Sequence, residues 1–290
     1  MTNFLYQLEI DFKRIILRNP AFFMFDLAMP LTFYLLFTKA LPQYSNTMQW
    51  KVDYLVSMAI YGILLGSIMT VAHTLSSDID RKFTLFIDLS PFPKLMYYIE
   101  MIIIFEVLNL LCLVGIGLAG ILVNNLTLPT KVWILLLVLI PIMSLPLVLL
   151  GILISSFKDS NVINALANIL VFPMAICSGL WWPLSVLPQW LQKIGKVTPT
   201  YYISNLSNNI LHGNSINYNS LVGLIIWFVV LVLALGISYI FTSKRIEKTD
   251  EEVFKKARII SKLRRTSPLF LVTMVISSSK CVTYIAHYYA

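Results

Sequence analysis

The chain has 290 residues, of which 58% are hydrophobic and only 12% are charged, and its mean hydropathy is +0.79. Soluble domains are typically about 45–50% apolar and about 25% charged. The composition therefore excludes an ordinary soluble domain and indicates a membrane protein with several spans. In such a protein, a net charge of +8 marks the cytoplasmic side of the membrane and does not indicate a nucleic-acid partner.

The first predicted element is an amphipathic helix over residues 3–18, within a cytoplasmic region 1–20. Apolar side chains recur there at helical spacing, and polar side chains form the opposite stripe. The apolar set is Phe4, Leu5, Leu8, Phe12, Ile15 and Ile16, and the polar set is Gln7, Asp11, Arg14 and Arg18. This pattern predicts a helix on the inner membrane surface, with Phe12, Lys13, Arg14 and Arg18 as its candidate interface residues. The alternative is a solvated leader before the first span.

Six apolar stretches then reach the length of about 20 residues that a helix needs to cross a bilayer. They cover residues 21–41, 53–75, 97–123, 132–156, 161–180 and 219–243. We therefore expect an all-α integral membrane protein with a six-span transmembrane domain, 21–243.

The basic residues predict the orientation of these spans. With the N-terminus inside, the inner segments are 1–20, 76–96, 157–160 and 244–290, and they hold 17 of the 22 Lys and Arg residues. Cytoplasmic segments are enriched in these residues. Both termini are therefore expected in the cytoplasm, with residues 244–290 as a charged tail.

The link between the second and third spans is longer than a simple connection needs. It begins with the charged residues Asp78, Asp80, Arg81 and Lys82, continues through an amphipathic run that includes Thr84, Leu85, Phe86 and Leu89, and stops at Pro91. This pattern predicts a short helix over about 78–93, parallel to the membrane and able to dock in a cleft of a soluble partner. A plain re-entry turn is the alternative.

Polar side chains inside spans are candidates for a transport pathway or gate, because they are costly in a bilayer. Glu106 and Asn109 share one face of the third span, and Asn164 and Asn168 share one face of the fifth. A direct role in transport and a purely structural helix contact both remain open for these residues.

Nucleotide and metal motifs are not indicated. The string GIGLAG, residues 115–120, matches a dinucleotide fingerprint by letter, but it lies inside an apolar helix, where glycines favour close helix packing. The sequence contains no P-loop, so we expect no ATP site and no cofactor on this chain. The three histidines and three cysteines are scattered, and no metal site is expected.

The segment over about 179–200, before the last span, concentrates aromatic residues and prolines. Trp181, Trp182 and Pro183 follow the fifth span, and a short amphipathic helix is expected over 188–196, ending before Pro199. We expect a re-entrant or surface-lying outer cap, with Trp181, Trp182 and Pro183 as candidate gate residues. A plain membrane anchor without a gating role is the alternative.

These two connecting segments resemble those of ABC-2 type transporter permeases. Between spans two and three the resemblance rests on Asp80-Arg81-Lys82, Thr84-Leu85, Leu89 and Ser90-Pro91. Before the last span it rests on Ser178-Gly179, Pro183, Pro188, Trp190-Leu191, Ile194 and Pro199. The resemblance covers about residues 1–245.

The resemblance implies a non-enzymatic permease of the bacterial cell membrane that pairs with a second permease copy or paralogue and with ABC ATPase subunits, which bind ATP and Mg²⁺. It implies ATP-driven export of a hydrophobic or amphipathic substrate such as a drug, an antimicrobial peptide, a lipid or a glycolipid. The 78–93 and 3–18 helices would receive the motion of the ATPase. A stand-alone secondary transporter or channel would be expected to show repeat symmetry and charged midplane sites, and an intramembrane enzyme would need convergent catalytic groups; both alternatives are less well supported.

Overall fold

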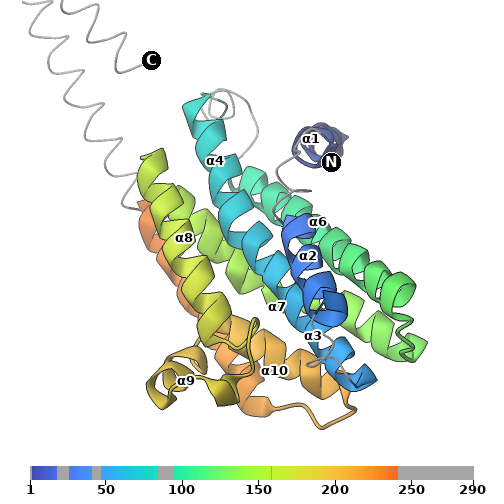
Figure 1. The fold of residues 1–290 in the computed structure, drawn as a ribbon. Coiled ribbons are helices and arrows are strands. Elements are labelled where there is room, and N and C mark those ends of the chain that lie inside the picture. The colour runs from blue at the N-terminus through green and yellow to red at the C-terminus, as the bar shows by residue number, and fades with distance from the viewer. Residues whose placement is uncertain are drawn as a thin grey trace, which may run out of the picture. The chain divides into compact units, whose positions relative to one another are not determined.

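The computed structural model describes residues 2–17, 26–40, 47–81, 83, 94–157 and 159–240, and its regular structure there is helical (Figure 1). The chain divides into two compact units, Met1–Leu235 and Gly236–Ala290. The helix packing that follows lies within the first unit.

Five helices are long and apolar enough to cross a membrane. They are Met48–Asp80, Leu95–Asn124, Thr130–Ser155, Ser160–Cys177 and Tyr218–Ile240. They coincide with five of the six predicted spans, so the expectation of an all-helical protein with several membrane spans is confirmed. The predicted first span, 21–41, contains α2 (Met29–Leu35) and the π-helical turn η3 (Leu36–Ala40). Residues 18–25 and 41–46 lie outside the described residues, and the count of six stays a prediction.

The core of the fold is one long helix built from α3 (Met48–Leu65), the π-helical turn η4 (Gly66–Thr70) and α4 (Val71–Asp80). Thr47 begins it, since its Oγ1 accepts a hydrogen bond from the Trp50 backbone N–H at 3.2 Å. Of its most apolar stretch, 83% is buried. Its 33 residues extend about 50 Å at the helical rise, well beyond a hydrocarbon core of about 30 Å. The ends of this helix therefore project past the membrane core.

Other helices surround this long helix (Figure 1). Against α3 pack α6 (Lys94–Asn124), α7 (Thr130–Ser155) and α10 (Pro199–Leu211), while α7 and α8 (Ser160–Cys177) pack against α4. Small residues permit this close approach. A Cβ added at Gly120 of α6 would overlap Leu55, and one at Gly117 would lie 3.0 Å from the Trp133 ring. The glycines of the GIGLAG string thus serve helix packing.

The two ends of the first unit differ. At one end, called the α1 end below, α1 (Thr2–Phe12) and the π-helical turn η1 (Lys13–Leu17) lie beside α6. At the other, called the cap end, α8 is followed by η5 (Leu184–Val186), α9 (Gln189–Gly195) and α10 (Figure 1).

Helix α9 corresponds to the short helix expected over 188–196, but the role expected for Pro199 was incomplete. Pro199 is the first residue of α10, where the missing N–H costs nothing. Thr198 caps α10, because its Oγ1 accepts a hydrogen bond from Tyr201 N at 3.3 Å. The sequence did not predict α10, because its 13 residues are too short for a span and Ser and Asn interrupt its apolar stripe of Ile203, Leu206 and Ile210.

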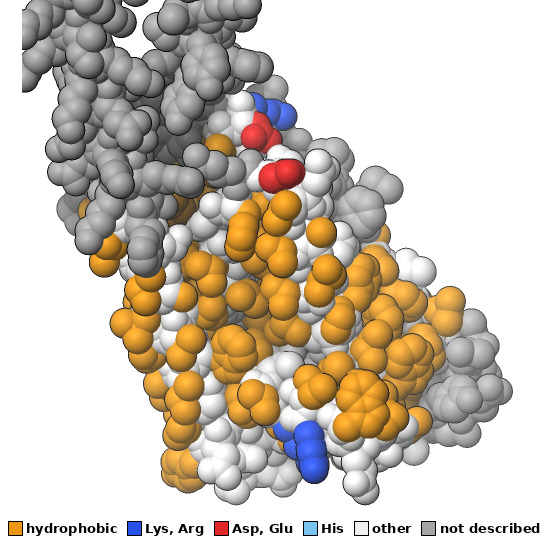
Figure 2. All heavy atoms as spheres, turned by 90° about the vertical axis from the view of Figure 1, so that its left-hand side faces the viewer, with side chains coloured by type: hydrophobic (Ala, Val, Ile, Leu, Met, Phe, Trp, Pro, Cys, Tyr) orange, Lys and Arg blue, Asp and Glu red, His pale blue; other side chains and the backbone are white. Residues whose placement is uncertain are grey.

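The described surface is rich in exposed apolar side chains. Figure 2 shows one such face, where hydrophobic side chains cover the middle and charged side chains lie toward the two ends. Large exposed residues of this kind include Leu122, Ile134, Ile169, Ile226 and Leu233. Of the most apolar stretch of Tyr218–Ile240, only 17% is buried. A surface of this kind requires lipid or another apolar surface around it.

Candidate functional site

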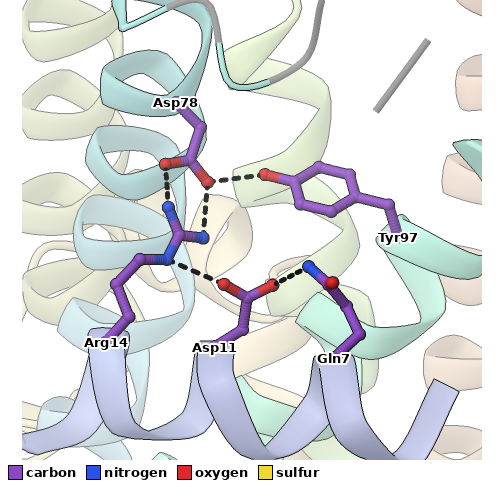
Figure 3. A network of polar contacts seen from close by, with 5 residues as sticks. All are labelled: Gln7, Asp11, Arg14, Asp78 and Tyr97. Atoms are coloured by element: carbon purple, nitrogen blue, oxygen red, sulfur yellow. Dashed lines mark hydrogen bonds and ion pairs between the residues drawn. The ribbon is translucent and has the colours of Figure 1, made fainter. Parts of the chain in front are cut away.

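A network of polar side chains joins three segments at the α1 end (Figure 3). Arg14 binds Asp78 at the end of α4 with both terminal nitrogens, at 2.5 and 2.9 Å. The Tyr97 hydroxyl of α6 donates to the same carboxylate at 2.7 Å. On α1 itself, Asp11 contacts Arg14 Nε at 2.8 Å and accepts a hydrogen bond from Gln7 Nε2 at 3.1 Å. We call Gln7, Asp11, Arg14, Asp78 and Tyr97 the α1 network.

The α1 network places one guanidinium, that of Arg14, against two carboxylates. Asp11 and Asp78 are both buried. Burial lowers the pKa of Arg14, but the hydrogen bonds and charge of Asp78 outweigh this effect, and the pKa of Arg14 is raised on balance. The Phe83 ring lies 4.5 Å from the guanidinium carbon, as in a cation–π contact. Arg14 therefore holds α1, the end of α4 and the first part of the 78–93 segment together.

The predicted coupling and interface residues divide into those that join this network and those that do not. Asp80 lies two residues after Asp78 and accepts a hydrogen bond from Ser160 Oγ of α8 at 3.0 Å. Arg81 is exposed, Phe12 is half-buried, and Lys13 is exposed and paired with Glu9. Lys82, Thr84, Leu85, Phe86, Leu89, Pro91 and Arg18 lie outside the described residues.

The polar stripe of α1 faces the protein, which the sequence did not predict. The sequence placed Gln7, Asp11 and Arg14 opposite the apolar stripe of a surface helix, whereas the structure turns Asp11 and Arg14 onto α4 and α6. Tyr6 and Ile10 are exposed, while Phe12 and Ile15 of the predicted apolar stripe also pack on the core. The available signal was the i, i+4, i+7 spacing of Gln7, Asp11 and Arg14, which is as regular as that of a buried face.

A second polar cluster lies between the spans. Asn109 of α6 donates hydrogen bonds to Ser67 Oγ at 3.0 Å, Ser144 Oγ at 3.2 Å and Glu106 Oε2 at 3.3 Å. Ser144 of α7 in turn donates to Glu106 Oε2 at 3.0 Å. The two predicted residues Glu106 and Asn109 thus connect α6 to η4 and α7.

The same cluster continues to Asp26, before α2. Thr70 Oγ1 donates to Asp26 Oδ2 at 2.5 Å. Gly66 lies between Asp26 and Asn109, since a Cβ added at Gly66 would be 3.4 Å from Asp26 Oδ2 and 3.5 Å from Asn109 Oδ1. The π-helical turn η4 supplies Gly66 and Thr70 together, a local irregularity that often marks functional sites. We call Asp26, Ser67, Thr70, Glu106, Asn109 and Ser144 the mid-span cluster; sequence reasoning found only Glu106 and Asn109.

A cavity of about 770 Å³ leads from the α1 network to the mid-span cluster. Its lining includes Arg14, Asp26, Thr70, His73, Asp78 and Asn168. The predicted Asn168 therefore faces the same cavity as Asp26. Its side chain donates to the backbone oxygen of Asn164, which is half-buried. The predicted pair Glu106 and Asn109 does not join the predicted pair Asn164 and Asn168, because Glu106 and Asn109 are absent from the lining of this cavity.

A second cavity, of about 890 Å³, lies at the cap end. The predicted gate residues Trp181, Trp182 and Pro183 line it together with Trp50 and Tyr54. Trp181 is half-buried among aromatic rings, with ring centroids 5.4 Å from Tyr61 and 5.8 Å from Trp182. The Trp181 ring therefore packs against Tyr61 of the central helix while it also lines the cavity.

Helix α9 packs closely against the C-terminal end of α8. A Cβ added at Gly195 would overlap the backbone oxygen of Cys177 and lie 2.6 Å from its carbonyl carbon. We expect Gly195→Ala to displace α9 and to lower the free energy of unfolding by about 1–3 kcal/mol, the usual cost of overpacking. Thermal unfolding of the purified protein in detergent measures this. Gly236→Ala, at an exposed position with nothing within 4 Å, is the matched control, and equal stability of the two variants would contradict the docking described.

Comparisons with known proteins agree with the membrane architecture. A family model described as "ABC-2 type transporter" matches residues 6–212. The protein "Putative transport permease YvfS" of Bacillus subtilis (strain 168) is 27% identical over 232 residues, covering 80% of this chain and 95% of that protein. No solved structure matches. The α1 network, the mid-span cluster and the cap-end cavity all lie within the residues that the family model matches.

Proposed function

Since this chain belongs to the ABC-2 type transporter family, we propose that it is the membrane-spanning subunit of an ATP-driven exporter of hydrophobic or amphipathic substrates. The family and its relative support the coarser statement that the chain is a transporter permease, a multi-pass membrane subunit that is generally non-catalytic and pairs with an ABC ATPase. The outward direction, the substrate class, a second permease copy and ATP and Mg²⁺ binding by the partner ATPase belong to the proposal.

The α1 network is the observation that carries the proposal. In the proposed orientation the α1 end is cytoplasmic, and the ATPase docks on the 78–93 segment. Asp78 and Phe83 of that segment both contact Arg14 of η1, the turn that continues α1. A push from the ATPase would therefore move α1, α4 and the start of α6 together, as one near-rigid body.

The two cavities support a path for the substrate between the two ends. The cavity at the α1 end has polar residues along α4 and apolar residues such as Met29, Leu65 and Phe172 on its other walls. A lining of this mixed kind suits an amphipathic substrate. The mid-span cluster lies next to this cavity through Asp26, and the aromatic cavity at the cap end would be the exit.

We expect Asp26, which lines the cavity, to matter more for transport than Glu106, which does not. Asp26→Asn should reduce ATP-dependent transport in inside-out vesicles. Glu106→Gln should leave transport within about twofold, because the amide oxygen still accepts the hydrogen bond from Ser144. Thermal unfolding of both variants checks that the fold is intact. Loss of transport in folded Glu106→Gln, with normal transport in Asp26→Asn, would contradict this prediction. The carboxyl group that matters for transport would then be that of Glu106.

Co-purification with an ABC ATPase tests the function. Replacing residues 83–89 with a Gly-Ser linker should abolish substrate export and substrate-stimulated ATP hydrolysis. Replacing residues 213–217, an exposed connection at the cap end, with the same linker is the control and should preserve stimulation. If export and stimulation both survive the first replacement, the 78–93 segment does not couple to an ATPase.

A further inference from the structure

The cap-end cavity has a lining of aromatic rings from two parts of the chain. Phe37 comes from η3, Trp50 and Tyr54 come from α3, and Trp181 and Trp182 come from the segment after α8. Trp50 and Tyr54 stack with their ring centroids 4.9 Å apart, and Phe37 lies 5.5 Å from Tyr54. Rings of this kind attract flat apolar groups and cations over their faces.

The charge of this lining is negative. Asp53 is its only carboxylate, and no Lys or Arg belongs to the lining as the structure describes it. His212 Nε2 lies 3.0 Å from Asp53 Oδ1, and Gln49 Nε2 lies 3.1 Å from His212 Nδ1. The described residues provide no hydrogen bond to Asp53 Oδ1. Among the described residues, no Lys or Arg pairs with Asp53, and His212 is the one basic side chain beside it.

Two further polar atoms of the lining residues are left unpaired. Trp181 Nε1 and Asn208 Oδ1 are buried and have no hydrogen-bond partner among the described residues. Buried polar groups are normally paired, so an occupant that pairs with them would have polar groups of its own. This favours an amphiphilic occupant over a plain hydrocarbon chain.

From these observations we propose that the cap-end cavity binds an amphiphilic organic cation with aromatic rings, held by the tryptophans and by the charge of Asp53. The volume of about 890 Å³ accommodates a drug-sized molecule. The role of this cavity as the exit site for such a substrate rests on the export function proposed above. Binding of the cation in the cavity does not depend on the direction or the energy source of transport.

Binding of tetraphenylphosphonium to the full-length permease in lipid nanodiscs tests the proposal, with empty nanodiscs subtracted and tetraphenylborate as an anion of the same shape. We expect saturable binding of the cation and none of the anion. Asp53→Asn, which keeps an acceptor for His212, should weaken cation binding roughly tenfold. Asp159→Asn, at the cap of α8 outside this cavity, should leave it unchanged.

The aromatic contribution has its own pair of variants. Trp182→Leu removes an exposed ring from the lining, whereas Trp190→Leu removes an exposed ring of α9 that does not line the cavity. Only the first should weaken binding. Equal binding of cation and anion, or equal effects of Asp53→Asn and Asp159→Asn, would overturn the proposal.

The outcomes separate this inference from the proposed function. If ATP-driven export is observed but the nanodiscs bind no cation, the inference fails and the function stands. If the cation binds at Asp53 and no ATP-driven export of any amphiphile occurs, the binding site stands and the export function fails.

Discussion

Replacing Arg14 with methionine should lower the free energy of unfolding by about 3 kcal/mol and abolish substrate-stimulated ATP hydrolysis, because breaking a buried ion pair leaves its partner uncompensated. Arg14 is the only described cation in contact with the buried carboxylates of Asp11 and Asp78. Methionine retains much of the side-chain volume but provides no charge and no donor. Both buried carboxylates would then lack a counter-charge.

Unfolding can be followed with a thiol-reactive fluorophore. Cys112 and Cys177 are buried and free, so they become reactive when the helices separate. A Cys281→Ser background removes the third thiol. Lys13→Met is the matched control, because its ion pair with Glu9 is exposed and such pairs contribute little to stability. If Arg14→Met and Lys13→Met unfold alike, the α1 network does not hold this end of the protein together.

A lysine at position 14 separates charge from geometry. Lysine keeps the positive charge but not the fork that binds both oxygens of Asp78 and also reaches Asp11. We expect Arg14→Lys to recover part of the stability and less of the coupling. Full recovery of coupling would mean that the positive charge alone transmits the motion, without the hydrogen bonds of the guanidinium to Asp11 and Asp78.

Gly151→Ala should be the second most disruptive substitution. A Cβ there would overlap the backbone oxygen of Ser67 and lie 2.9 Å from Val71 Cβ. Backbone cannot rotate away, so α7 must move from η4, at a cost of about 1–3 kcal/mol. The movement would also separate Ser144 of α7 from Asn109.

The effect of Gly151→Ala is measured by the same thiol assay and by ATP-dependent transport. Gly236→Ala adds the same methyl group at an exposed helical position with nothing within 4 Å, where alanine favours the helix. We expect normal unfolding for the control and early unfolding with reduced transport for Gly151→Ala. Normal stability and transport for both would contradict the close packing of α7 on η4.

Periodicity explains what the sequence could predict. Long apolar runs predicted the five observed spans, and the i, i+3 spacing of Glu106 and Asn109 placed them on one face, where the structure pairs them at 3.3 Å. Each of these predictions depends only on the geometry of a single helix.

The contacts between helices could not be predicted from the sequence. Asp26 and Thr70 are 44 positions apart and Arg14 and Asp78 are 64 apart, and no local pattern connects them. The inward turn of the α1 polar stripe likewise depends on Asp78 and Tyr97 being there to receive it. The aromatic and Pro-rich segment after α8 predicted an outer cap, but no local pattern showed that Trp181 packs on Tyr61 of the central helix.

Transport by the purified components tests the central claim most directly. Inside-out proteoliposomes containing the full chain and its ABC ATPase should accumulate tetraphenylphosphonium when Mg-ATP is added outside. They should not do so with the Arg14→Met variant, or with wild-type chain lacking the ATPase. Accumulation driven by a proton or sodium gradient without ATP or ATPase would contradict the account and identify the chain as a stand-alone secondary transporter.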